Sequence, residues 1–122
     1  MTHALRRRTL LLAPALLGFS ARDAAAHAVL VSSQPPANAL IPAGPTKFLL
    51  RFNTRVDQAR SRLILLATDG LQTTLSIYPA GEQDVLSSTG IVAPGGQALR
   101  WQVLAADGHI SRGEIPFKAI RS

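Results

Sequence analysis

The sequence predicts an all-β fold after residue 26, a small antiparallel sandwich or barrel. Two observations support this prediction: apolar residues recur with a period of two, and turn-forming residues separate the alternating runs. No stretch shows a convincing long helical pattern. A series of short strands at this spacing is typical of small antiparallel sandwiches and barrels.

Four strands are expected where the alternation is clearest, because alternate residues of a strand share one face. Each places three apolar residues on a face: Phe48, Leu50 and Phe52; Leu63, Leu65 and Ala67; Leu99, Trp101 and Val103; and Ile115, Phe117 and Ala119. Trp101 keeps phase with its apolar neighbours, so we assign it to the core. Pro116 lacks a backbone donor, which predicts that the last strand is an edge strand.

The first 26 residues have the three-part pattern of a cleaved export signal. Three arginines at residues 6–8 precede an apolar run from Thr9 to Ala21, and small residues at 24–26 provide a cleavage site. The apolar run is shorter than the roughly 20 residues that span a bilayer, so no permanent membrane anchor is expected. Residues 7–11 also resemble a twin-arginine signal, which leaves the choice between the Sec and twin-arginine routes open.

Two cleavage positions fit the small-residue rule. A cut after Ala26 makes His27 the first residue, whereas a cut after Ala28 discards His27. We expect the first cut, for the chemical reason given below, and therefore a cleaved signal at residues 1–26 and a single domain at residues 27–122. With 96 residues, this domain is large enough for one modest core.

The charge of the expected domain argues against a nucleic-acid partner. Residues 1–26 contain four arginines and one aspartate, so their removal lowers the net charge from +6 to +3. The domain has no lysine run and no interleaved aromatic residues, so nucleic-acid binding is not expected. Four arginines at positions 51, 55, 60 and 62 surround Asp57, and we interpret them as part of a solvated face.

Two histidines are candidates for metal binding. The chain has no cysteine and no methionine after Met1, so the domain has no sulfur ligand. A histidine at the first position offers a metal ion its free amine and its ring Nδ1 together. In Asp107-Gly108-His109, the glycine between the two side chains lets a turn direct both to one side. The three residues offer three nitrogens and one oxygen, a set that suits Cu(II) or Ni(II) and favours copper over zinc.

A second interpretation of the same residues needs no metal. Asp-Gly is a frequent turn dipeptide, so Asp107 could serve only to close a reversal, as expected for Asp69, with His109 a solvated loop residue. His27 would then be no more than a neighbour of the cleavage site. Spacing alone leaves both interpretations open.

Across most of the expected domain, the sequence resembles the CopC-type periplasmic copper-resistance family. The resemblance rests on segments in family order: Ala26 to Leu30, Ser33 to Asn38, Phe48 to Asn53, Leu99 to Val103, Ala106 to His109, and Gly113 to Phe117. The most specific piece is the strand that leads into Asp107-Gly108-His109, with Trp101 six residues before the aspartate. A histidine directly after the cleavage site reinforces it.

The resemblance implies both a fold and a copper site. The fold would be a seven-stranded immunoglobulin-like or Greek-key β-sandwich or barrel with Cu(II) held near its amino terminus. Carried over to this chain, His27 would supply amine and imidazole, Asp107 a carboxylate and His109 an imidazole, for one Cu(II) per chain. Because no methionine follows Met1, the Cu(I) site of some family members is absent, and we expect binding of Cu(II) only.

Three positions depart from the family pattern. Gln97 stands where tyrosine is frequent, Ala105 stands where serine is common, and Pro116 interrupts the last strand. We expect these departures to affect packing more than metal binding.

The predicted function is that of a periplasmic Cu(II)-binding protein without enzymatic activity. It would sequester copper or pass it to a copper-transporting membrane protein or to another periplasmic copper protein. Ligation displaces protons from the amine and the imidazoles, so the affinity should fall in mild acid. Two alternatives are a histidine-brace copper oxidase or monooxygenase and a metal-free exported β-sandwich that serves as an interaction module.

Overall fold

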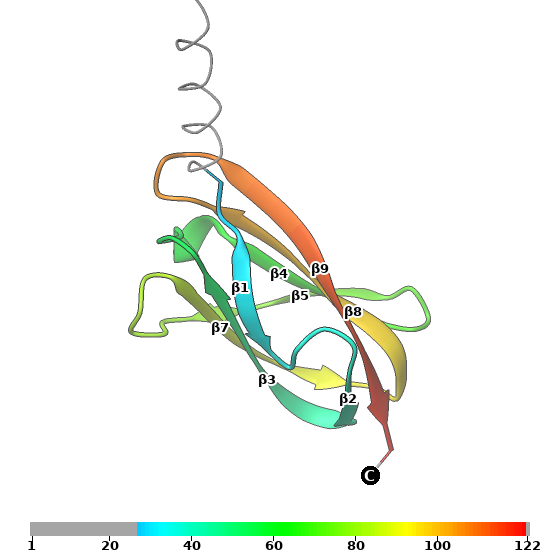
Figure 1. The fold of residues 1–122 in the computed structure, drawn as a ribbon. Coiled ribbons are helices and arrows are strands. Elements are labelled where there is room, and N and C mark those ends of the chain that lie inside the picture. Colours follow the sequence, from blue (N-terminus) through cyan, green and yellow to red (C-terminus); the bar gives the residue numbers. More distant parts are fainter. Residues whose placement is uncertain (1–26, 122) are drawn as a thin grey trace, which may run out of the picture.

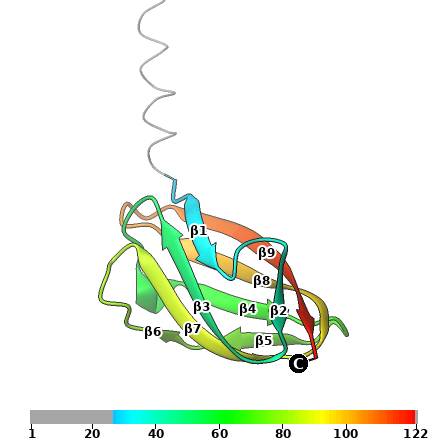
Figure 2. The ribbon, with the colours of Figure 1, turned by 60° about the horizontal axis from the view of Figure 1, so that its bottom comes forward.

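The computed structural model describes residues 27–121 and confirms the all-β sandwich. Two antiparallel-dominated sheets pack face to face, as Figures 1 and 2 show from two directions. The expected export signal at residues 1–26 lies outside the described residues. Among residues 27–121, no helix has the length and apolar character needed to cross a membrane.

The strands are assigned to the two sheets as follows. The four-stranded sheet has the order β1-β3-β7-β6, and the five-stranded sheet has the order β2-β9-β8-β4-β5. Their bounds are β1 Leu30–Gln34, β2 Ala39–Pro42, β3 Gly44–Phe52, β4 Arg62–Leu66, β5 Gln72–Leu75, β6 Ile77–Tyr78, β7 Val85–Val92, β8 Gly95–Leu104 and β9 Ile110–Ile120. A 3-10 turn, η2, spans Gln58–Arg60.

The described residues form nine strands, whereas seven were expected, because two extended segments change sheets midway. The chain leaves the five-stranded sheet after β2 and enters the other sheet at β3, with Gly44 at a φ of 120° at the start of β3. It crosses again between β5 and β6, around Ser76. Each crossing turns one extended segment into two strands. The two sheets remain separate, so the structure is a sandwich and not a closed barrel.

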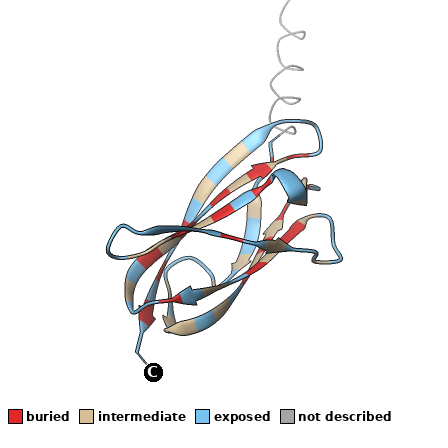
Figure 3. Cartoon of the chain, turned by 180° about the vertical axis from the view of Figure 1, so that it is seen from behind, coloured by how far each residue is buried: buried red, intermediate tan, exposed pale blue. Residues whose placement is uncertain are grey.

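The core lies between the sheets and is formed by the predicted alternating residues. Phe48, Leu50, Leu63 and Leu99 are each at most 1% exposed. Figure 3 shows buried bands alternating with exposed bands along the long strands. Trp101 is buried and packs edge-on against Phe52, with ring centroids 5.2 Å apart, as its phase with the core residues predicted.

The prediction that Pro116 places the last strand at an edge of its sheet is wrong. Strand β9 lies between β2 and β8 and is therefore not an edge strand of its sheet. The ladder with β2, however, begins at Phe117, so no strand pairs with Pro116 on that side. The Pro116 carbonyl there accepts a hydrogen bond from the Asn38 amide at 2.6 Å. The missing N–H of proline thus falls where the sheet needs no donor.

Candidate metal site

The loop between β8 and β9 holds two of the candidate ligands in a tight hairpin. The Gly108 amide donates to the Ala105 carbonyl at 2.9 Å, and the Ala105 amide donates to the His109 carbonyl at 2.8 Å. Gly108 has a φ of 93°, a backbone conformation that favours glycine. A three-residue loop that ends in such a glycine is a frequent hairpin connection. The predicted Asp-Gly turn is confirmed.

The described chain begins beside this hairpin, and its first residues are fixed in place. Ala28 is only 4% exposed and belongs to the core. The Val29 amide donates to Asn53 Oδ1 at 2.8 Å, and the Asn53 amide donates to the Val29 carbonyl at 3.0 Å. Figure 1 shows the start of β1 next to the turn between β8 and β9. The burial of Ala28 and the two hydrogen bonds between Val29 and Asn53 fix the start of β1, so His27 lies at this end of the sandwich.

His27, from the start of the described chain, lies beside His109, and His109 contacts Asp107 within the hairpin. The rings of His27 and His109 meet edge to face, with centroids 5.6 Å apart and planes at 70°. His109 Nδ1 lies 3.3 Å from Asp107 Oδ1, and about half of each of these two side chains is exposed. Because Nδ1 of His109 faces the carboxylate, its Nε2 is the ring nitrogen that remains outside this contact. The site is an exposed surface cluster at the end of the hairpin.

Asp107 serves the turn as well as the cluster. Its Oδ1 accepts a hydrogen bond from the His109 amide at 3.1 Å, which is the turn-closing role that the metal-free interpretation assigned to it. This backbone hydrogen bond is the main cause that lowers the pKa of the Asp107 carboxyl from its usual value. The His109 imidazole lowers this pKa further, and desolvation opposes the change. The carboxylate is therefore kept ionised, as a metal ligand must be.

Asp69 closes a turn in the same way as Asp107 but has no histidine beside it in the turn. Its Oδ1 accepts from the Leu71 amide at 3.0 Å, and Gly70 has a φ of 89°, so the same turn chemistry recurs between β4 and β5. Asp107 differs in having a histidine beside its carboxylate and a second histidine ring next to that one. The turn alone accounts for both aspartates, but it does not account for the histidines.

The cluster is not a closed metal site as it stands. Within the described part of the chain, no group of three or more histidine, aspartate or glutamate side chains is already arranged to hold a metal ion. One expected donor, the amine of His27, exists only in a chain that begins at that residue. The donor types nonetheless fit Cu(II), which binds imidazole, amine and carboxylate in planar sets. All three side chains are exposed to solvent.

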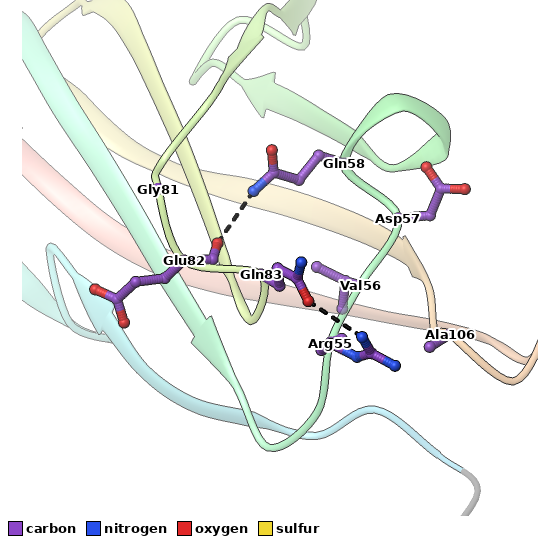
Figure 4. A pocket seen from close by; sticks show the side chains of 8 residues that line it. All are labelled: Arg55, Val56, Asp57, Gln58, Gly81, Glu82, Gln83 and Ala106. Atoms are coloured by element: carbon purple, nitrogen blue, oxygen red, sulfur yellow. Dashed lines mark hydrogen bonds between the residues drawn. The ribbon is translucent and has the colours of Figure 1, made fainter.

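A surface depression of about 600 Å³ lies beside the hairpin (Figure 4). It is bordered by the segments around Val56 and Gln83 and by Ala106, and no candidate ligand lines it. The Ala106 amide donates to the Arg55 carbonyl at 3.2 Å, and the Val56 amide donates to the Gln83 carbonyl at 3.0 Å. These hydrogen bonds connect the hairpin loop to the loop around Arg55, and that loop to the one around Gln83, so the walls of the depression help to hold the hairpin in place.

Sequence reasoning missed the residues that position the ligands. The segment from Phe48 to Asn53 was noted only as part of the family resemblance, whereas Asn53 clamps the start of the chain. The Arg55 carbonyl fixes the hairpin through Ala106. The hydrogen bonds of Asn53 and Arg55 join segments far apart in the chain and involve backbone groups, so no pattern of residue types in the sequence indicates them.

The departures from the family pattern lie in the packing. Gln97 is buried near the start of β8, and its Nε2 donates to the carbonyls of Ala93 and Gly95 at 2.7 and 3.1 Å. Ala105 is buried in the core, and its backbone closes the hairpin. None of the candidate ligands is replaced by these departures.

The comparisons with known proteins identify the family and the fold of the chain. The CopC domain model matches residues 30–119, so the chain belongs to the CopC family. Among solved structures, it is similar to CopC from Methylosinus trichosporium OB3b, with 28% identity and a TM-score of 0.71 over 78% of this chain and 95% of that one. Membership of this family gives the chain a copper-related function.

A second solved structure supports the fold alone. The chain is similar to PcoC from Escherichia coli, described as a methionine-rich copper resistance protein, with 20% identity and a TM-score of 0.64. The match covers 78% of this chain and all of PcoC. No protein with a curated description matches the chain. The chain has a single methionine, Met1, and thus differs in composition from a methionine-rich relative.

Proposed function

We propose that the exported chain begins at His27 and binds one Cu(II) ion at the end of the β8–β9 hairpin. His27 would supply its amine and imidazole, Asp107 a carboxylate and His109 an imidazole. The observation that carries this proposal is the contact between the two histidine rings, 5.6 Å apart, beside the Asp107–His109 pair. The two histidines are separated by most of the domain and are both exposed, so packing of the core does not explain their contact.

The burial of Ala28 supports the cut before His27. A cut after Ala28 would remove a residue of the hydrophobic core as well as one candidate ligand. Cleavage after Ala26 preserves both and creates the amine. The expected domain at residues 27–122 and its export signal at residues 1–26 are parts of the same proposal.

The biological role that fits such a site is the handling of copper in the periplasm. An exposed site lets the ion enter and leave, which suits sequestration or transfer to a copper-transporting membrane protein or another periplasmic copper protein. We propose no enzymatic activity, because Asp107 beside His109 would occupy a coordination position that an oxidase needs for oxygen. Accumulation of hydrogen peroxide by the reduced, copper-loaded protein would contradict this part of the proposal.

Substitution of His109 and Asp107 tests the site against the metal-free interpretation. We expect His109→Ala to weaken Cu(II) binding and to change its visible spectrum. Asp107→Asn should also weaken binding, although an asparagine Oδ1 can still close the turn. The matched control is Asp69→Asn, which removes the same charge from the same kind of turn, away from the histidines. The titration of copper-free protein with Cu(II) measures all three.

Unchanged affinity and spectrum in His109→Ala would contradict the assignment of the ligands. Equal effects of Asp107→Asn and Asp69→Asn would attribute the role of Asp107 to net charge or to the turn alone. Intact mass spectrometry of the exported protein, with and without one equivalent of Cu(II), determines the first residue and the stoichiometry together.

The pH dependence of copper binding should follow the nitrogen ligands. The pKa of Asp107 is held below its usual value, so this carboxylate stays ionised as the pH falls through the range where protons compete for amine and imidazoles. We expect the Cu(II) affinity to fall steadily between about pH 8 and pH 5. Asp107→Asn should lower the affinity at every pH without moving this decline. A shift of the decline in that variant would show that Asp107 itself titrates there.

A further inference from the structure

The positive charge of the domain is concentrated on the outer face of the five-stranded sheet. Four cations point outward there, opposite the core, and Glu114 is the only acid among them: Arg62 on β4, Arg100 on β8, and Arg112 and Lys118 on β9. We call these five residues the basic face. Its net charge of +3 equals that of residues 27–122, because the other five cations are matched by five acids.

Three of the cations surround one shallow depression. Arg62 and Arg112 lie on either side of Gln102 in the strand register, and Arg100 is two residues from Gln102 on the same strand. With strands about 4.8 Å apart, the backbones of Arg62 and Arg112 are separated by only about 10 Å. A depression of about 370 Å³ lies between them and is lined by all three arginines.

The hydrogen bonds and ion pairs of these arginines neutralise only part of their positive charge. Arg112 Nε donates to Gln102 Oε1 at 2.8 Å, a neutral partner that orients the guanidinium without neutralising it. Arg100 contacts Glu114 at 3.3 Å, and both side chains are about half exposed. Arg62 has no ion-pair partner among residues 27–121, whereas Arg51 and Arg60 each contact an acid.

We propose that the basic face binds a phosphate group, carried by a small molecule or by a phospholipid headgroup. Guanidinium groups match phosphate oxygens with paired donors, and three of them within about a Debye length act on one anion together. The depression has room for such a group at their centre. No aromatic side chain is exposed on this face in the described chain, which disfavours a stacked nucleic-acid base.

Two triple variants test this proposal, and they differ only in where three positive charges are removed. The basic-face variant combines Arg62→Gln, Arg100→Gln and Arg112→Gln. The control, Lys47→Gln, Arg60→Gln and Arg121→Gln, removes the same three charges from exposed positions elsewhere. Thermal unfolding of both variants establishes that they fold. All measurements use the copper-free protein, so a failure of the proposed copper site does not affect the outcome.

Calorimetry with inorganic pyrophosphate and sedimentation with phosphatidylglycerol vesicles distinguish the two sources of phosphate. We expect one of these probes to bind the wild-type chain and the control, and to bind the basic-face variant about tenfold or more weakly. Phosphatidylcholine vesicles should not bind. Binding of pyrophosphate alone indicates a small-molecule ligand, and preference for the vesicles indicates a headgroup.

Other outcomes would overturn the proposal. Absence of binding to both probes would do so, as would equal losses in the basic-face variant and in the control. Binding of poly-glutamate without binding of either phosphate probe would assign the face to an acidic protein partner instead.

Discussion

A chain that carries one extra residue before His27 is expected to bind Cu(II) at least about a hundredfold more weakly than the chain that begins at His27. The loss of an outer-shell partner alone typically costs a metal site about 10- to 100-fold in affinity, and here a direct ligand is lost. The extra residue turns the amine into an amide and abolishes its chelate with the imidazole. Both imidazoles and the Asp107 carboxylate remain.

The measurement is a competitive Cu(II) titration of two chains that differ only in whether Ala26 is retained. A third chain, with an alanine added after Ser122, has the same added mass at the other end and should bind like the chain that begins at His27. Equal affinity of all three would remove the amine from the ligand set. The two histidine rings and Asp107 would then have to account for the whole affinity.

The fold was predictable because its signal is local. The alternation at residues 48–52, 63–65, 99–103 and 115–119 follows from burial of one strand face, and the structure confirms it. Ala67, also expected on a strand face, lies just beyond the end of β4 and is not buried. The two sheet crossings were not predictable in this way. Around Ala43 and Ser76 the chain stays extended while it changes partners, so its composition does not mark the point where one strand becomes two.

The candidate site was predictable from chemistry, but its support was not. Asp107 and His109 were identified by their shared turn, and His27 by the expected cleavage. Their proximity depends on Asn53 and on the burial of Ala28, contacts between residues more than 20 positions apart. The family match shows the fold and a copper-related function, and the ligand set is proposed from the positions of His27, Asp107 and His109.

The sequence does not show which arginines lie together in space. It predicts that Arg51, Arg55, Arg60 and Arg62 are part of a solvated face, and none of the four is buried. In the structure, Arg51 contacts Glu82 and Asp84, and Arg60 contacts Asp57. The basic face instead joins Arg62 to arginines that lie 38 and 50 residues further along the chain. Only the strand register reveals such a grouping.

Gly113→Ala is expected to lower the free energy of unfolding by about 1–3 kcal/mol, the usual cost of overpacking a core. Gly113 pairs with Trp101 across β8 and β9. A Cβ at this position would lie 2.5 Å from Trp101 Cζ2 and 2.7 Å from Cε2. The indole is rigid and packs edge-on against Phe52, so it cannot move without disturbing the core.

The matched control is Gly96→Ala, on β8 of the same sheet. A Cβ there would meet no atom within 4 Å, and no left-handed φ restricts the position. This variant should therefore be neutral or slightly stabilising. Thermal unfolding measures the difference, because each kcal/mol shifts the midpoint of a domain of this size by roughly 4–8 °C. Equal midpoints for the two variants would show that the indole has room to move.

The same pair of variants separates stability from copper binding. Trp101 Nε1 is buried with no hydrogen-bond partner in the described residues, so packing against Gly113 and Phe52 fixes the ring. Asp107 and His109 lie in the turn of the hairpin and are held by its own turn bonds. Folded Gly113→Ala should therefore keep its copper stoichiometry well below its unfolding temperature. A loss of copper binding in the folded variant would mean that the core beneath the hairpin, as well as its turn, sets the position of the ligands.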